Sequence, residues 1–205
     1  MKSLLKTMAV ATVLVLTAAT AQAATTTYNL GGNGADALSM SFGDLTVTAG
    51  YNPIPGSPAN VTQTTGGLGV NNHHIDDDRA DGRFRDDVLY LSFGSAVDLI
   101  SATFTSISGD RFSFWADVDG DGLENGEKFG THLDPSGSTY TFTGSLLKNA
   151  ALFGLEAELS GSDWRLQSIT VSAVPIPAAL PLFGAALIGM GFLARRRKQK
   201  ASLQA

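Results

Sequence analysis

The sequence contains no cysteine, and only 16% of its 205 residues are charged. The absence of cysteine excludes a small domain held together by disulfides, and it also excludes a thiol nucleophile. The charged share is well below the ~25% of an average globular domain, which argues against a long coiled coil. With 14 basic and 19 acidic side chains, the composition also argues against a nucleic-acid binder.

The charges that are present are unevenly placed along the chain. Seven of the 14 basic residues lie at the two ends, at Lys2, Lys6 and within residues 195–200. All 19 acidic residues lie between Asp36 and Asp163, so residues 24–173 carry 7 basic against 19 acidic side chains, a net charge of −12. This pattern is typical of an exported acidic domain with a membrane-related segment at each end.

The N-terminus has the three parts of a secretory signal peptide. Two lysines precede an apolar run over residues 8–19, and the run is followed by Ala21, Gln22 and Ala23. Signal peptidase requires small side chains at the first and third positions before its cut, so we expect cleavage after Ala23 and a signal peptide over residues 1–23. A retained anchor is the alternative, but the run is short for a bilayer of about 30 Å.

The C-terminus, residues 174–205, also has three parts. A proline-rich segment at 174–178 leads into an apolar run at 178–194, and a basic tail follows at 195–205. The apolar run has the minimum length for a transmembrane helix, about 17 residues. The basic tail is expected to stay in the cytoplasm, which leaves residues 24–173 outside the inner membrane.

This arrangement resembles a bacterial PEP-CTERM-type sorting signal, and most closely the variant known as VPLPA-CTERM. Ile176 stands where the name of the variant has leucine, which is a conservative exchange. The resemblance implies that a membrane-embedded exosortase recognises the tail and hands the protein to the cell surface or the extracellular matrix. A plain single-span anchor is the alternative. The recognition motif would be Val174, Pro175, Ile176, Pro177 and Ala178.

The middle of the chain shows short alternating apolar and polar runs, which predict β-strands. Residues 153–159 alternate so that Glu156 and Glu158 share the face opposite the apolar side chains. In the last run Leu166 and Ile169 are out of phase, which predicts a bulge between them. Residues 50–72 are rich in proline and glycine and predict a long loop. About nine such strands predict one antiparallel β-sandwich domain over residues 24–173.

Three segments also resemble the ectodomains that accompany such tails. They are residues 67–70, residues 88–93 and the closing run at 164–171. Those ectodomains look like jelly-roll sandwiches, and most have no assigned activity. The resemblance therefore implies a jelly-roll-like fold and a non-catalytic role.

The clearest candidate site is a run of aspartates with glycines at residues 117–122. Carboxylates at the first, third and fifth positions with glycine at the sixth are similar to the calcium loop of an EF-hand. The twelfth position, normally a bidentate glutamate, is Lys128, so we expect Glu127 to replace it and the affinity to fall toward the ~10⁻⁴–10⁻³ M of extracellular modules. A solvated turn without a metal is the alternative. The candidate ligands are Asp117, Asp119, Asp121, Asn125 and Glu127.

A second acidic cluster lies at residues 73–81. Asp76, Asp78 and Asp81 are candidates to share a calcium ion. Adjacent side chains on an extended backbone point apart, so the two histidines at 73 and 74 are poor candidates for a joint zinc site. A hydrated loop neutralised in part by nearby arginines is the simpler interpretation.

Two further functions remain as alternatives. Carbohydrate binding would use Trp115 and Trp164 as stacking surfaces if they are exposed, and core packing is the alternative for both. A secreted hydrolase has thin support, because no nucleophile elbow and no metalloprotease helix motif is present. The sequence thus predicts an exported, non-catalytic β-sandwich protein that binds calcium, with extracellular polysaccharide as a further candidate partner.

Overall fold

The chain between the two terminal segments is built almost entirely from β-strands, as its alternating pattern predicts. The computed structural model describes residues 23–34, 36–51, 56–72, 78–83, 85–105, 109–135, 137–158 and 161–173. Within those ranges no helix is both long and apolar enough to cross a membrane. The predicted signal peptide up to residue 22 and the whole predicted sorting signal, with Val174, Pro175, Ile176, Pro177 and Ala178, lie outside the described residues.

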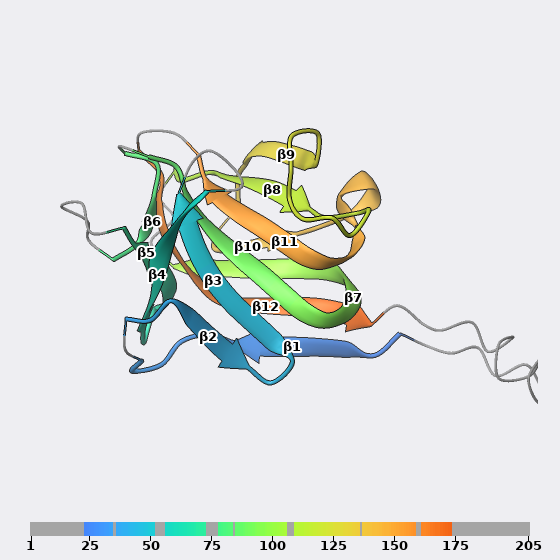
Figure 1. Cartoon of the computed structure of the whole chain (residues 1–205), viewed down its shortest axis with the longest axis horizontal. Helices are drawn as coiled ribbons and strands as arrows, with labels where there is room; N and C mark the ends of the chain where they lie inside the picture. The colour runs from blue at the N-terminus through green and yellow to red at the C-terminus, as the bar shows by residue number, and fades with distance from the viewer. Residues whose placement is uncertain are drawn as a thin grey trace, which may run out of the picture. The chain divides into compact units, whose positions relative to one another are not determined.

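Twelve strands and one short 3₁₀ helix, η1 (Gly144–Leu146), make up the described chain (Figure 1). All pairings between the strands are antiparallel, as the sandwich prediction requires. The strands are β1 (Thr25–Asn29), β2 (Ser39–Phe42), β3 (Leu45–Tyr51), β4 (Ser57–Thr64), β5 (Gly67–Asn71), β6 (Ala80–Asp81), β7 (Asp87–Thr105), β8 (Phe112–Ala116), β9 (Lys128–Leu133), β10 (Thr139–Thr141), β11 (Asn149–Ala157) and β12 (Asp163–Ala173).

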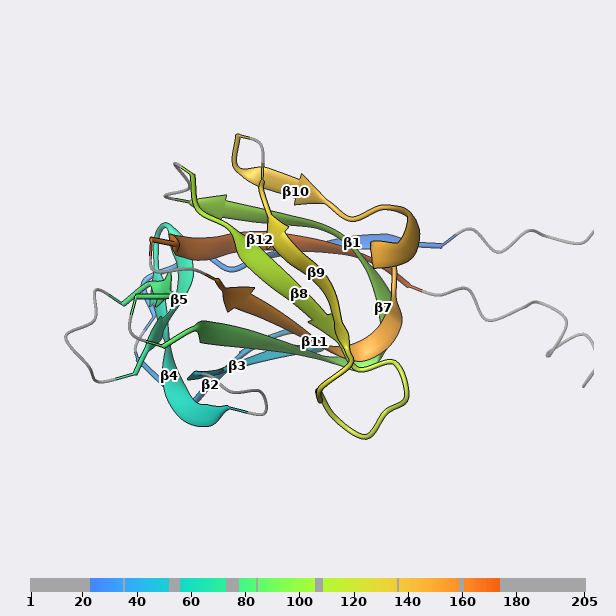
Figure 2. The same ribbon diagram turned by 90° about the horizontal axis from the view of Figure 1, so that it is seen from above.

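Strand β7 joins the two layers of the sandwich-like fold. Its first half pairs with β3 and β11, and its second half pairs with β12 and β10. The three residues at the changeover, 94–96, are exposed. Figure 2 shows β1, β12 and β10 along one side and β2, β3 and β11 along the other. β7 is thus one continuous strand that turns from one layer into the other.

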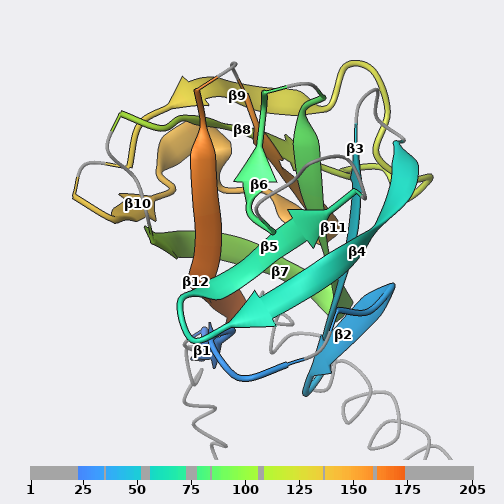
Figure 3. The same cartoon turned by 90° about the vertical axis from the view of Figure 1, so that its left-hand side faces the viewer.

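The hairpin of β4 and β5 closes one end of the fold (Figure 3). β4 pairs with β3, while β5 reaches β12 through Leu68 and Leu166. The prediction of a long loop over residues 50–72 is therefore wrong. The alternation of Ala59 with Val61 and of Leu68 with Val70 is present, and all four are buried, but the glycines, prolines and threonines around them obscure it.

The core between the layers is rich in aromatic side chains. Phe114 lies 4.7 Å from Phe142 between ring centroids, and Phe104 lies 5.1 Å from Trp164. The predicted bulge in β12 is confirmed, because the register with β7 shifts between Leu166 and Ser168. The extra residue allows Leu166 and Ile169 to be fully buried together, although a regular strand would place them on opposite faces.

The two ends of the described domain lie side by side. β1 and β12 are antiparallel neighbours, and the backbone N–H of Ala173 donates to the carbonyl oxygen of Ala24 at 2.9 Å. Residues 23–174 form one compact unit, and every buried apolar side chain of the core lies within it. The segments on either side of this unit therefore leave it at the same end of the β1–β12 pair.

Candidate metal site in the acidic loop

Residues 117–127, the acidic loop, connect β8 to β9. The loop is closed at its base, where the N–H of Ala116 donates to the carbonyl oxygen of Glu127 at 3.2 Å. The N–H of Asp117 donates to the carbonyl oxygen of Leu152 on β11 at 3.0 Å. Its glycines at 120, 122 and 126 all have positive φ, between 89° and 113°, a conformation that a side chain would oppose. The glycines of the motif thus allow the tight turns that bring its carboxylates together.

One apolar residue attaches the acidic loop to the sheet. Leu123 is only 6% exposed and packs with Trp115 and Val88 on the outer face of the sheet, away from the main core. A Cβ at Gly154 would lie 3.0 Å from a methyl group of Leu123, so the absence of a side chain there makes room for the contact. The loop is therefore docked on β8 and β11 and does not extend freely into solvent.

The first group of carboxylates consists of Asp117, Asp119 and Glu127, whose oxygens lie within 4.8 Å of one another. Asp117 accepts hydrogen bonds from the N–H groups of Gly120 at 2.6 Å and Gly122 at 3.2 Å. Glu127 is buried, and its two oxygens accept from the N–H groups of Val118 at 2.8 Å and Glu124 at 3.1 Å. These bonds orient the carboxylates, and each oxygen keeps a lone pair for a cation.

The second group consists of Asp119, Asp121 and Glu124, all exposed and again within 4.8 Å. A hydrogen bond with Asp119 and the negative charges of Asp119 and Glu124 raise the pKa of Asp121. Asp119, Asp121 and Glu124 thus concentrate negative charge in this part of the loop. A divalent ion between the two groups would supply the compensating positive charge.

The predicted ligands are largely brought together. Asp117, Asp119, Asp121 and Glu127 all belong to the two carboxylate groups. Asn125 has no carboxylate, and its amide oxygen stays a predicted ligand. Glu124 joins the second group, although the sequence analysis missed it. Glu124 could have been suspected because it is an acidic residue in the same loop, between the glycine at 122 and Glu127. The EF-hand pattern, however, assigns no ligand to its position.

Lys128, at the position where an EF-hand has its bidentate glutamate, has a different role. Its ammonium group lies 2.8 Å from Glu156 on β11 and 3.3 Å from Glu158, which follows the end of that strand. Glu156 is 3% exposed and also accepts from the indole N–H of Trp115 at 2.9 Å. Burial on its own would lower the pKa of Lys128, but the contacts with Glu156 and Glu158 outweigh it and raise the pKa.

Glu158 completes this ionic network. Burial tends to raise the pKa of its carboxyl, but hydrogen bonds from the hydroxyl of Ser113 and the N–H of His132, together with Lys128, hold it below its usual value. As predicted from the alternation, Glu156 and Glu158 lie on the face opposite the core. The network lies on the same outer face as Leu123 and fastens β9, the edge strand after the loop, to β11.

The second predicted cluster is only partly described, because Asp76 lies outside the described residues. Asp78 has a positive φ of 60°, and the carboxylate of Asp81 accepts from the N–H of Arg83 at 2.8 Å. Within the part of the chain that the structure describes, groups of three metal-ligating side chains occur only in the acidic loop. The calcium site of Asp76, Asp78 and Asp81 stays a prediction.

Of the two alternatives for the tryptophans, packing is confirmed and exposure is not. Trp115 is 7% exposed and lies under Leu123, with the ammonium of Lys128 5.1 Å from its ring centroid. Trp164 is 1% exposed and packs edge-on against Phe104. Neither indole has a free face, so the stacking site proposed for a sugar is not formed by these rings.

The arrangement of the acidic loop suits a hard divalent cation held by oxygen ligands. Five carboxylates form two groups that share Asp119, and one of them, Glu127, is buried. The chain matches no protein-family model, no curated protein and no solved structure. Its function is therefore inferred from its own residues and their geometry.

Proposed function

We propose that the protein is an exported component of the bacterial cell surface or extracellular matrix, with a non-catalytic, jelly-roll-like β-sandwich stabilised by calcium in the acidic loop. The observation that carries the proposal is the convergence of Asp117, Asp119 and Glu127 within 4.8 Å on a loop that Leu123 attaches to the sheet. The signal peptide and the sorting signal, read from the sequence, supply the route out of the cell.

Calcium is preferred to other ions for chemical reasons. The grouped candidate ligands are all carboxylate oxygens, with no thiolate or imidazole among them, which disfavours zinc. Magnesium demands a near-ideal octahedron and gives up its waters reluctantly, whereas calcium accepts irregular sites of six to eight oxygens. An exposed loop with several carboxylates therefore fits calcium at the millimolar concentrations outside cells.

Thermal unfolding tests the metal site directly. Calcium at ten times its dissociation constant should stabilise the protein by about 1.4 kcal/mol, and magnesium at the same concentration by much less. Asp119→Asn should abolish most of the calcium effect, because Asp119 belongs to both carboxylate groups. Asp134→Asn removes one exposed charge outside the loop and should leave the calcium effect unchanged. An unchanged melting temperature on adding calcium contradicts the metal site.

The export route has its own test, which is independent of calcium. The intact mass and terminal peptides of the protein from its native cells should show an N-terminus at Ala24 and a C-terminus within or just after residues 174–178. A C-terminus at Ala205 would contradict removal of the tail and would indicate a single-span membrane protein.

A further inference from the structure

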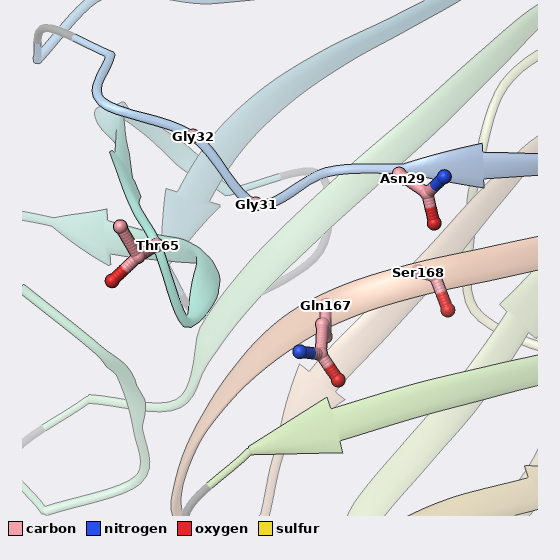
Figure 4. Close-up of a pocket in the computed structure, with 6 residues that line it drawn as sticks. All are labelled: Asn29, Gly31, Gly32, Thr65, Gln167 and Ser168. Atoms are coloured by element: carbon pink, nitrogen blue, oxygen red, sulfur yellow. The ribbon is translucent and has the colours of Figure 1, made fainter.

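A shallow pocket of about 360 Å³ lies at the far end of the β1–β12 pair from the two chain ends (Figure 4). Asn29 and Ser168 face each other across these strands in the antiparallel register. Gln167 is the extra residue of the β12 bulge, and Figure 4 shows its side chain on the same side as those of Asn29 and Ser168. The pocket is lined by Asn29, Gly31, Gly32, Thr65, Gln167 and Ser168.

The walls of this pocket are fixed by hydrogen bonds from neighbouring residues. The N–H of Leu30 donates to the carbonyl oxygen of Gln167, and the N–H of Gly32 donates to that of Thr64, both at 2.9 Å. The hydroxyl of Thr105 donates to the carbonyl oxygen of Gly66 at 2.8 Å and holds the β4–β5 turn. A Cβ at Gly31 would lie 2.8 Å from the carbonyl oxygen of Thr65, so glycine is needed for the two walls to approach. These contacts indicate that the pocket is preformed.

The polar groups that line the pocket are free to bind. The side chains of Asn29, Thr65, Gln167 and Ser168 make no hydrogen bond with the rest of the described chain. Two of them are primary amides and two are hydroxyls, so each is both a donor and an acceptor. A bulge commonly re-aims a side chain, and here it adds a second amide beside the Asn29–Ser168 pair.

The pocket continues into a polar surface without charge. The strand registers define two rows of hydroxyl and amide side chains that cross β1, β12, β7 and β10 in that order. Hydrogen bonds between hydroxyls link neighbours within the rows, from Thr27 to Thr170 at 2.9 Å and from Thr103 to Thr139 at 3.1 Å. The rows are Asn29, Ser168, Thr103 and Thr139, and then Thr27, Thr170, Ser101 and Thr141.

This lack of charge is unusual for the domain that carries it. Residues 24–173 have 19 acidic and 7 basic side chains, yet neither the pocket nor the two rows contains one. A cationic or anionic ligand would find no counter-charge among these side chains. A neutral ligand with many hydroxyl groups, such as a sugar ring, would find both hydrogen-bond donors and acceptors here, because each amide and each hydroxyl supplies both.

We propose that the pocket binds a short stretch of a neutral polysaccharide, whose continuing chain lies along the two hydroxyl rows. At about 360 Å³ the pocket is near the small end of ligand sites, which suits one part of a longer chain. No aromatic side chain lines it, so each contact is weak and repeated contacts along one polysaccharide supply the retention. This goes beyond the proposed function and does not depend on the calcium site.

The test uses the full chain in a zwitterionic detergent without sugar headgroups. Saturation-transfer-difference NMR is recorded with neutral oligosaccharides of glucose, mannose, galactose and N-acetylglucosamine, and with oligogalacturonate as the anionic comparison. At least one neutral oligosaccharide should receive magnetisation, while oligogalacturonate should not. The Asn29→Ala, Ser168→Ala double variant should weaken binding about tenfold, and Thr65→Ala in the turn should weaken it severalfold.

The matched control lies at the other end of the same two strands. Thr25 and Ser172 form the same kind of cross-strand pair, away from the pocket, so the Thr25→Ala, Ser172→Ala double variant should bind like the unaltered chain. Absence of transfer to every neutral oligosaccharide overturns the proposal. Equal losses in the two double variants, or binding of oligogalacturonate alone, also overturn it. None of these outcomes bears on the calcium effect or on the processed termini.

Discussion

Among single residues, Leu123 has the largest influence on the acidic loop, because it is the apolar contact that docks the loop on the sheet. Val118 lies in the same loop but is 51% exposed. The two residues have similar chemistry and opposite surroundings. They therefore form a matched pair for asking what docking contributes.

Leu123→Ala should lower the free energy of unfolding by about 2–3 kcal/mol, since it removes buried methyl groups above Trp115 and leaves a cavity. Val118→Ala should change it by less than about 0.5 kcal/mol. Urea unfolding followed by tryptophan fluorescence measures both values. If docking orders the carboxylates, Leu123→Ala also reduces the stabilisation by calcium. Equal effects of the two substitutions would mean that the loop is not docked in solution.

Glu158 makes the stability of the fold depend on pH. Its folded-state pKa is depressed, so its contribution is fully present above the ordinary glutamate value of about 4.3 and is lost as the pH falls through the lower folded-state value. Unfolding measured from neutral pH into the acid range should show this loss. Glu158→Gln should be less stable at neutral pH and should have a flatter profile in acid. A profile with the same slope as the unaltered protein contradicts the role of Glu158.

Among the elements, β12 is tightly constrained, because it pairs with β1, β5, β6 and β7 and carries the bulge at Gln167. Deleting Gln167 forces either Leu166 or Ile169 out of the core. The expected loss is about 2–5 kcal/mol. Gln167→Ala keeps the backbone and should cost less than about 0.5 kcal/mol. Thermal unfolding compares them, and similar melting temperatures for the two variants would show that the bulge is dispensable.

The elements that could be predicted from sequence are those whose own residues alternate clearly. The faces of Glu156 and Glu158 and the bulge between Leu166 and Ile169 follow from a period of two. The β4–β5 hairpin could not be found in this way, because its partner β12 comes from a distant part of the chain and its polar residues resemble those of a loop.

The ligand residues of the candidate site could be predicted from the sequence, but the packing around them could not. Asp117, Asp119 and Asp121 follow from the spacing of the motif, since that spacing describes a local turn. The burial of Trp115 was not predictable, because it depends on Leu123 folding back over the outer face of the sheet. Neither the docking of the loop nor the salt bridges of Lys128 with Glu156 and Glu158 can be inferred from local alternation alone.

For the whole molecule, the position of the core predicts that the compact unit folds without the terminal segments. Among the described residues, the buried apolar side chains all lie between Leu30 and Val171, within the compact unit of residues 23–174. This unit, expressed without the terminal segments, should fold alone and unfold in one cooperative transition. Circular dichroism and tryptophan fluorescence should give coincident melting curves. Curves that differ would mean that the core needs the segments outside it.

The proximity of Ala24 and Ala173 has a mechanical consequence. If the domain is held at its C-terminal end and loaded at the pocket, the force runs along β12, from Ser168 to Ala173. β12 is flanked by β1 on one edge and by β7 on the other, so the hydrogen bonds of both ladders would be loaded in shear and would have to break together. A pull that separated the ends of β1 and β12 would instead break their bonds one at a time. The same domain would thus resist tension along its length and yield to force applied between its two ends.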